Sequence, residues 1–307
     1  MIGKAAVYVL LLIILLGSLY FLYQNLPGEP EELSVSYSSN PELPEIKANS
    51  SISQFYPNMR FRNSRIFYFI DTKCNDVQEE RIKRAFDSIS QEVGVIQFQN
   101  NIESEAEIIA VCSKDYVQLE GNLIKPGEGG PTEIINTSKY NIILSGAIFM
   151  YGSLECEYPI VEVHEIMHVL GFDHINESMD IMYPYSSCEQ RISAKEISIL
   201  RELYSVESLP DLSFSNVSAV KKGRYLDFSL EIKNIGLDDA NGVILSVLDS
   251  DKVIKEFDIG EVGIVQGKSL LVENLKLSSR DTEGIVFEIK GNKQELNEEN
   301  NILTLSI

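Results

Sequence analysis

The sequence predicts three parts: a helix that crosses a membrane, an α+β domain and an all-β sandwich domain. A long apolar run near the N-terminus, alternating strand and helix patterns in the middle and short alternating strands near the C-terminus support this prediction. A chain of 307 residues allows about two folded domains. Its hydrophobic content of 44% is typical of domains with packed cores.

The chain is strongly acidic, with a formal net charge of −20. No cluster of lysines or arginines offsets this charge, so the surface field repels phosphate backbones. Nucleic acid is therefore excluded as a partner.

Residues 5–23 form an uninterrupted apolar run of the length that crosses a hydrocarbon core of about 30 Å. The apolar region of a secretory signal is shorter, so we expect residues 1–23 to be an uncleaved membrane anchor, with a cleaved signal as the alternative. Lys4 precedes the run and Glu29, Glu31 and Glu32 follow it. By the positive-inside rule, we expect a single-pass protein of the cell membrane whose remaining chain is extracellular.

Residues 24–54 are rich in Pro, Ser, Asn and Glu and have almost no apolar periodicity, which predicts a flexible linker. The α+β domain is expected over residues 55–207. Arg65–Ile70 reads as a strand. Asp76 is expected to cap a helix that ends at Gly94 and whose apolar stripe is Ile82, Phe86, Ile89 and Val93. Further strands are expected at residues 95–98, 106–111 and 140–144. A helix is expected from about Pro159, and another from the capping box at Ser193 to about Tyr204.

Residues 208–307 alternate short strands with turn residues. Residues 225–232 place Leu226, Phe228, Leu230 and Ile232 on one face, and residues 243–248 and 284–289 show the same alternation. This pattern predicts a β-sandwich.

The cysteines all lie between residues 55 and 207, at Cys74, Cys112, Cys156 and Cys188. On the exported side of a membrane they could form two disulfides, in any of three pairings. The alternative is that they are buried free thiols. None belongs to a C-x-x-C pair, which disfavours a thiolate zinc site.

The chemistry is concentrated between residues 163 and 174. His164 and His168 lie one turn apart on one side of the predicted helix, so both imidazoles can bind the same ion. Gly171 can end the helix in the left-handed conformation, which lets the chain bring His174 to that ion. Three neutral ligands leave a coordination position for water, as in catalytic zinc sites, and Glu165 can accept a proton from that water. These histidines are the only three in the chain, and all occupy ligand positions.

The pattern H-E-x-x-H-x-x-G-x-x-H, followed by Asp180-Ile181-Met182-Tyr183-Pro184, resembles the metzincin zinc peptidases and, among them, the matrixins. The resemblance covers about residues 55–207. It implies a catalytic domain with a mixed, twisted sheet and an active-site helix, and an extended peptide or protein substrate paired with an edge strand. It further implies a Met-turn at Met182, a pocket walled by Tyr183, Pro184 and Tyr185, and one catalytic zinc ion. No Asp-rich loop matches the family's calcium sites, so Ca²⁺ stays open.

The chain also departs from the matrixin pattern. Met167 stands where many matrixins have a small residue, and Ile175 follows the third histidine where they usually have serine. Position 184 is proline, so Tyr185 does not inherit the role of the Met-turn tyrosine of other metzincins. No cysteine-switch motif precedes the domain.

Residues 208–307 resemble CARDB domains, which are immunoglobulin-like modules of microbial cell-surface proteins. Pro210-Asp211-Leu212, residues 232–236 and residues 295–301 carry the resemblance. It implies a spacer or adhesive role and a cell-surface partner for this domain.

The sequence therefore predicts a membrane-anchored extracellular zinc endopeptidase. Two alternatives are a cell-surface adhesion protein with a non-catalytic zinc site and a hydrolase of a non-peptide surface polymer. A third function is self-processing, in which the enzyme cuts its own linker and is released from the membrane.

Overall fold

A computed structural model describes residues 2–37, 54–113, 117–118, 124–137, 139–152, 154–249 and 251–306. The chain divides into two compact units. One unit combines the N-terminal elements with residues 209–235 and the described residues from 239 on, and the other contains the described residues between 54 and 208.

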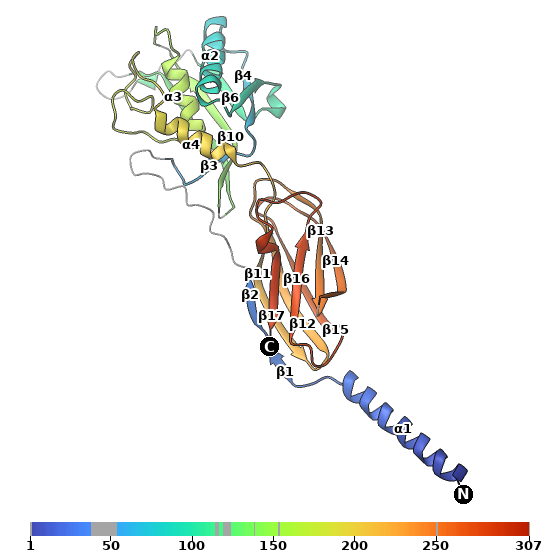
Figure 1. Ribbon diagram of the computed structural model, residues 1–307. Helices are drawn as coiled ribbons and strands as arrows, with labels where there is room; N and C mark the ends of the chain where they lie inside the picture. Colours follow the sequence, from blue (N-terminus) through green and yellow to red (C-terminus); the bar gives the residue numbers. More distant parts are fainter. Residues whose placement is uncertain are drawn as a thin grey trace. The chain divides into compact units, whose positions relative to one another are not determined.

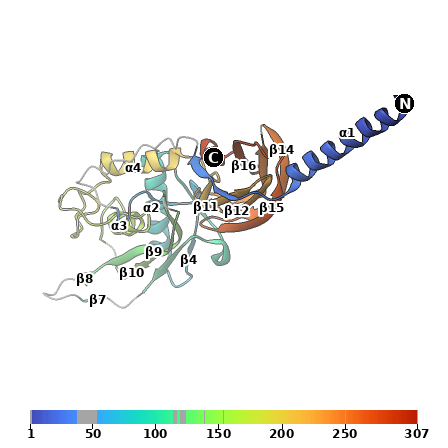
Figure 2. The same ribbon diagram turned by 90° about the horizontal axis from the view of Figure 1, so that it is seen from below.

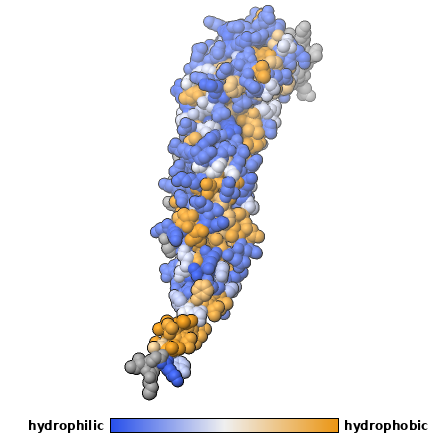
Figure 3. All heavy atoms as spheres, turned by 90° about the vertical axis from the view of Figure 1, so that its right-hand side faces the viewer, coloured by the Kyte–Doolittle hydropathy of each residue, from blue (hydrophilic) through white to orange (hydrophobic). Residues whose placement is uncertain are grey.

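The N-terminal helix α1 spans Ile2–Asn25. It is long and apolar enough to cross a membrane, and its large apolar side chains are exposed. In Figure 3 these side chains form an orange surface beside the grey N-terminal atoms. The predicted apolar helix is thus confirmed.

The unit between residues 54 and 208 contains a mixed sheet, as predicted for an α+β domain (Figure 1). Parallel strands run in the order β3, β10, β6, β4 and β5, and β9 pairs antiparallel with β10 at the edge. The strands are β3 (Met59–Phe61), β4 (Arg65–Ile70), β5 (Gln97–Asn100), β6 (Ile108–Cys112), β9 (Gly127–Asn136) and β10 (Asn141–Met150). A short hairpin joins β7 (Val117–Gln118) and β8 (Ile124–Lys125), and a 3-10 turn, η1, covers Glu103–Glu105.

Helix α2 (Asp76–Val93) begins with a capping box between Asn75 and Gln78, so the predicted cap at Asp76 is wrong by one residue. The helix ends at Gly94, which adopts the left-handed conformation. Its predicted apolar stripe is buried in the core of the unit. Helix α3 (Ile160–Val169) contacts β9, β10 and α2, and Figure 2 shows α2 and α3 together on one side of β9 and β10. Helix α4 (Ala194–Ser205) begins at the predicted capping box of Ser193 and Glu196.

The cysteines form two disulfides in this unit. Cys74 bonds to Cys112, and Cys156 bonds to Cys188. The second bond joins the chain before α3 to the loop before α4.

The other unit is a β-sandwich with its own core. One sheet has the order β1, β11, β12 and β15, and the other has the order β14, β13, β16, β17 and β2. The C-terminal strands are β11 (Leu212–Lys222), β12 (Tyr225–Asn234), β13 (Ala240–Asp249), β14 (Lys252–Val262), β15 (Gly267–Lys276), β16 (Gly284–Lys290) and β17 (Ile302–Ser306), with a 3-10 turn, η3, at Glu299–Asn301.

The prediction of a flexible linker over residues 24–54 is wrong for residues 30–37. These residues form β1 (Pro30–Glu32) and β2 (Ser34–Tyr37), which pair with β11 and β17. The strand pattern was not recognised, because its apolar residues, Leu33 and Val35, lie among prolines and polar residues. Residues 38–53 of the predicted linker lie outside the described residues.

Candidate metal centre

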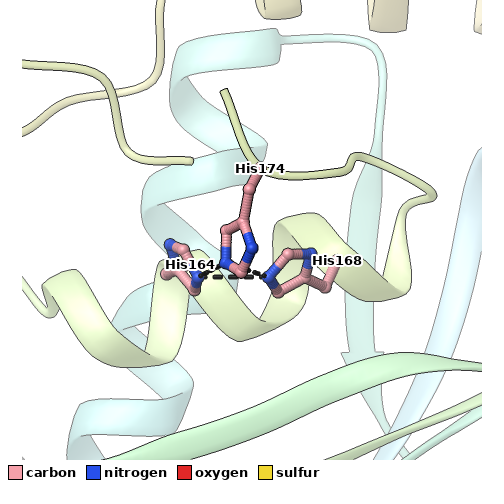
Figure 4. Close-up of side chains that lie close together, drawn as sticks. All are labelled: His164, His168 and His174. Atoms are coloured by element: carbon pink, nitrogen blue, oxygen red, sulfur yellow. Dashed lines mark hydrogen bonds between the residues drawn. The ribbon is translucent and has the colours of Figure 1, made fainter. Parts of the chain in front are cut away.

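Three imidazole rings meet beside α3 (Figure 4). His164 and His168 lie one helical turn apart on α3, and His174 comes from the segment that follows. Gly171 ends the helix with a φ of 95°, and a side chain there would collide with Met59. The Nε2 atom of His168 lies 3.1 Å from that of His164, and the Nε2 atom of His174 lies 3.2 Å from both.

Backbone carbonyls fix the orientation of the two helical imidazoles. His164 Nδ1 lies 2.5 Å from the Ile181 carbonyl oxygen, and His168 Nδ1 lies 2.7 Å from the Phe172 carbonyl oxygen. Because a carbonyl only accepts, each Nδ1 carries the proton and donates it. The Nε2 lone pairs of His164 and His168 therefore face the centre, as in metal-binding histidines.

This donor set fits a zinc ion. Nitrogens bound at about 2.0–2.1 Å around a tetrahedral ion lie about 3.3 Å apart. The observed Nε2 separations agree with this spacing, and facing lone pairs repel one another unless a cation lies between them. Among the described residues, these histidines form the group of His, Cys, Asp or Glu side chains close enough to hold a metal.

Burial keeps the imidazoles neutral. It lowers the pKa of His164 to about 3 and that of His168 to about 4, and it lowers the pKa of His174 as well. The neutral form is the one that binds a metal.

Glu165 follows the first histidine and faces the same cleft. Burial raises the pKa of its carboxyl group to about 8, while the Lys125 ammonium opposes this rise. A side chain at Gly127 would collide with the Glu165 carboxyl group, and one at Gly129 would collide with the Glu165 backbone. Strand β9 can therefore approach α3 only with glycine at both positions.

Met182 is fully buried in the core of this unit. Its backbone N–H donates to Asp180 Oδ1 at 2.8 Å, and the preceding residue, Ile181, supplies the carbonyl that holds His164. The loop that was predicted to be a Met-turn thus contacts the histidine cluster through its backbone.

The histidines and Glu165 open into a cleft of about 1360 Å³. Its wall includes Pro184 and Tyr185, and the Tyr185 side chain is 62% exposed. Tyr183, which was also predicted as a wall residue, does not line the cleft, and its ring centroid lies 5.9 Å from that of Tyr185. We refer to residues 183–187 as the pocket-wall loop.

The sequence reasoning did not identify several residues of this cleft. Phe55 stacks on His168 with ring centroids 5.9 Å apart, and Lys125 is another wall residue. Neither has a sequence signal, because each reaches the cleft through tertiary structure. The glycines of β9 do carry a signal once the strand is known, since glycine within a strand often marks the close approach of another backbone.

One of three comparisons with known proteins bears on this site. The model of the matrixin family matches residues 60–205. A search of curated proteins found no match. Among solved structures, the chain is similar to the CARDB domain of a Pyrococcus furiosus protein in complex with di-metal ions. The identity is 17% and the TM-score is 0.26, and the match covers 32% of this chain and 87% of the other.

The matrixin match includes the histidine cluster, Glu165 and the helices around them. Residues 60–205 therefore form a matrixin-like domain, and this match supports a metalloprotease.

Proposed function

We propose that this protein is a membrane-anchored extracellular endopeptidase that depends on one zinc ion. The observation that carries the proposal is the convergence of three Nε2 atoms, 3.1–3.2 Å apart, beside the Glu165 carboxyl group in an open cleft. A purely structural metal site needs neither an acid at this position nor a cleft.

His164, His168 and His174 would hold the ion. When bound, zinc would polarise the peptide carbonyl and acidify a water molecule in the cleft. Carbonyl groups of Ile181 and Phe172 keep two of the imidazoles in the metal-binding tautomer.

Glu165 would carry the proton. Its carboxylate accepts a proton from the attacking water and returns it to the leaving amine. Burial raises its pKa to about 8 and so favours proton uptake, while a nearby cation would favour the ionised form that starts the reaction. Contact with the glycines of β9 restrains the side chain.

The substrate would be a peptide or protein that lies along the cleft. Pro184 and Tyr185 would contact a substrate side chain, and the Tyr183 ring would support that of Tyr185. Met182 would support the metal centre, because the preceding residue, Ile181, holds His164 through its carbonyl group.

The membrane location rests on α1. Its apolar surface is exposed along its length, which suits a lipid environment, and Lys4 precedes this surface. The two disulfides suit the oxidising exterior of a cell.

The test is metal content and casein cleavage by the purified protein, with and without a chelator. Glu165→Gln should retain one zinc ion per chain and lose about 10²–10⁴-fold in cleavage rate, the usual contribution of a general acid–base group. Glu155→Gln is the matched control, because Glu155 is exposed on the approach to α3. One zinc ion without cleavage of any peptide would instead support the adhesive or non-peptide function.

A further inference from the structure

The sandwich is completed by residues that precede the metalloprotease domain in the chain. Strand β1 pairs antiparallel with β11, with Pro30 opposite Lys222 and Glu32 opposite Val220. Strand β2 pairs antiparallel with β17, with Ser34 opposite Ser306. Residues 30–37 therefore occupy one edge of each sheet.

Leu33 anchors residues 30–37 at the point where the chain passes from one sheet to the other. Its side chain is 8% exposed and packs in the sandwich core, and Val35 packs against the same core. Its backbone N–H donates to the Ala219 carbonyl oxygen at 3.2 Å. The contact thus combines an apolar anchor with backbone pairing, as when a peptide adds a strand to a sheet.

The end of α1 is held by side chains of the same sandwich. Arg280 lies over the Tyr23 ring at 4.5 Å and donates to the Tyr23 carbonyl oxygen at 2.8 Å. The Tyr225 hydroxyl group donates to the Asn25 carbonyl oxygen at 3.1 Å. These donors satisfy carbonyl groups that a helix leaves without partners at its C-terminus.

The connection between α1 and β1 also fits closely. A side chain at Gly28 would lie 2.8 Å from the backbone nitrogen of Gly223, which leaves no room for any residue but glycine. Lys221 is buried beside β1, and its Nζ atom lies 3.8 Å from the Glu31 carboxylate. The contact therefore extends from Tyr23 to Tyr37.

We propose that the edges of β11 and β17 form a docking site for residues 23–37 of the same chain, and that this non-covalent contact keeps the anchor helix on the enzyme after a cut between residues 37 and 54. That this contact would retain the enzyme on a membrane rests on the proposed function. A cut in this connection, by the enzyme itself or by another protease, would yield a two-chain enzyme that stays on the membrane. Release would need a second event that separates β1 and β2 from the sandwich.

The test uses the full chain in detergent, with an affinity tag at the N-terminus and a site for a specific protease inserted between residues 45 and 46. After complete cleavage, the C-terminal fragment should remain with the tagged N-terminal fragment during capture and washing. If it flows through at once, the proposal is wrong. The readout needs neither zinc nor a membrane, so its failure is distinct from failure of the proposed function.

A synthetic peptide of residues 26–37 tests the site without altering the protein. In excess, this peptide should displace the tagged fragment from the cut protein. The same peptide with Leu33→Asp should be about tenfold or more weaker, because an unpaired charge would enter the core. A peptide with Glu32→Ala is the matched control and should match the unaltered peptide, since Glu32 is exposed. Equal displacement by all three peptides would overturn the assigned docking site.

Discussion

Gln190 is a buried side chain that organises the pocket-wall loop. Its Nε2 atom donates to the carbonyl oxygens of Ser178 at 3.2 Å and Tyr185 at 2.8 Å. Its Oε1 atom accepts the backbone N–H of Ser187 at 2.9 Å. One amide group therefore fixes the backbone on both sides of Tyr185 without touching the histidines.

Replacing Gln190 by alanine should loosen the pocket wall and leave the metal in place. A buried backbone group that loses its partner costs about 1–3 kcal/mol, so we expect KM for peptides to rise about tenfold with a smaller change in kcat. Steady-state kinetics and zinc content would measure this. Met179→Ala is the control, since that side chain is 63% exposed. A fall in zinc content would show that Gln190 supports the metal centre itself.

Glu196 and Asp180 form a buried pair of carboxyl groups behind the same loop. Burial, aided by the neighbouring Asp180, raises the pKa of Glu196 to about 8. Burial likewise raises the pKa of Asp180, while hydrogen bonds from Met182 N–H and from Ser193 and Glu196 oppose the rise, and Glu177 adds to it. The folded chain thus holds a proton here that the unfolded chain releases.

This pair should make the metalloprotease domain less stable as pH rises. Glu196 titrates near 4.5 when unfolded and near 8 when folded, so its stabilisation is complete below pH 4.5 and is lost as pH rises through 8. The buried histidines, whose pKa values are lowered, contribute a slope of the opposite sign, and they are present with and without Glu196. Urea unfolding at pH 6 and pH 8 should therefore compare the Glu165→Gln protein with and without Glu196→Gln, a background in which Glu165 does not contribute. Adding Glu196→Gln should make the change in the free energy of unfolding from pH 6 to pH 8 more positive. An unchanged slope would assign the proton to another group.

At the scale of elements, the contact between β9 and α3 positions the Glu165 side chain. Glycine at positions 127 and 129 lets the strand lie against Glu165, whereas a side chain at Gly130 would meet nothing within 4 Å. In the same strand, Gly129 is therefore crowded by α3, whereas its neighbour Gly130 has open space around it.

Gly129→Ala should lower the free energy of unfolding by about 1–3 kcal/mol, the usual cost of overpacking, and should also reduce peptide cleavage. Gly130→Ala is the matched control and should be close to the unaltered protein in both measurements. Denaturant unfolding and casein cleavage would compare the two variants. Similar losses of stability and cleavage in both variants would mean that the strand propensity of the new residue, not its contact with α3, causes the losses.

The helices could be predicted from the sequence because their signals are local. Two polar caps, the glycine at 94 and the apolar stripes define α2 and α4, although the cap of α2 is Asn75 and not the predicted Asp76. The histidine spacing likewise predicted the metal centre on α3. Strand β9 was not predicted, because its glycines and Pro131 suggest a turn. Glycine is needed in this strand because α3, about 30 residues further along the chain, lies against it.

At the scale of the whole molecule, the two units have separate hydrophobic cores. Metal ligands occur in one of them, so metal binding should stabilise that unit alone. A ligand at 1,000 times its dissociation constant contributes about 4 kcal/mol to stability.

Thermal unfolding of the full chain should therefore show two transitions, and a chelator should lower the temperature of one. Added zinc should restore it, and His168→Ala should remove the response to zinc. Calorimetry with and without chelator would measure this. If both transitions shift together, the units unfold as one.

The order of the domains could also be predicted, but the composition of the sandwich could not. Residues 208–307 show regular alternation, which identified β12, β13 and β16 among its strands. Strands β1 and β2 have only Leu33 and Val35 as core residues among polar neighbours. Their partners are more than 180 residues away along the chain, and a local pattern holds no information about them.

The pairing of β2 with β17 has a consequence for synthesis. Tyr37 lies opposite Leu303, so β2 leaves the ribosome long before the strand with which it pairs. The metalloprotease domain, which is complete by residue 208, can fold while the sandwich strands are still being made. A chain that ends early would lack β17 and leave the edge of β2 exposed, a form that quality-control proteases can recognise.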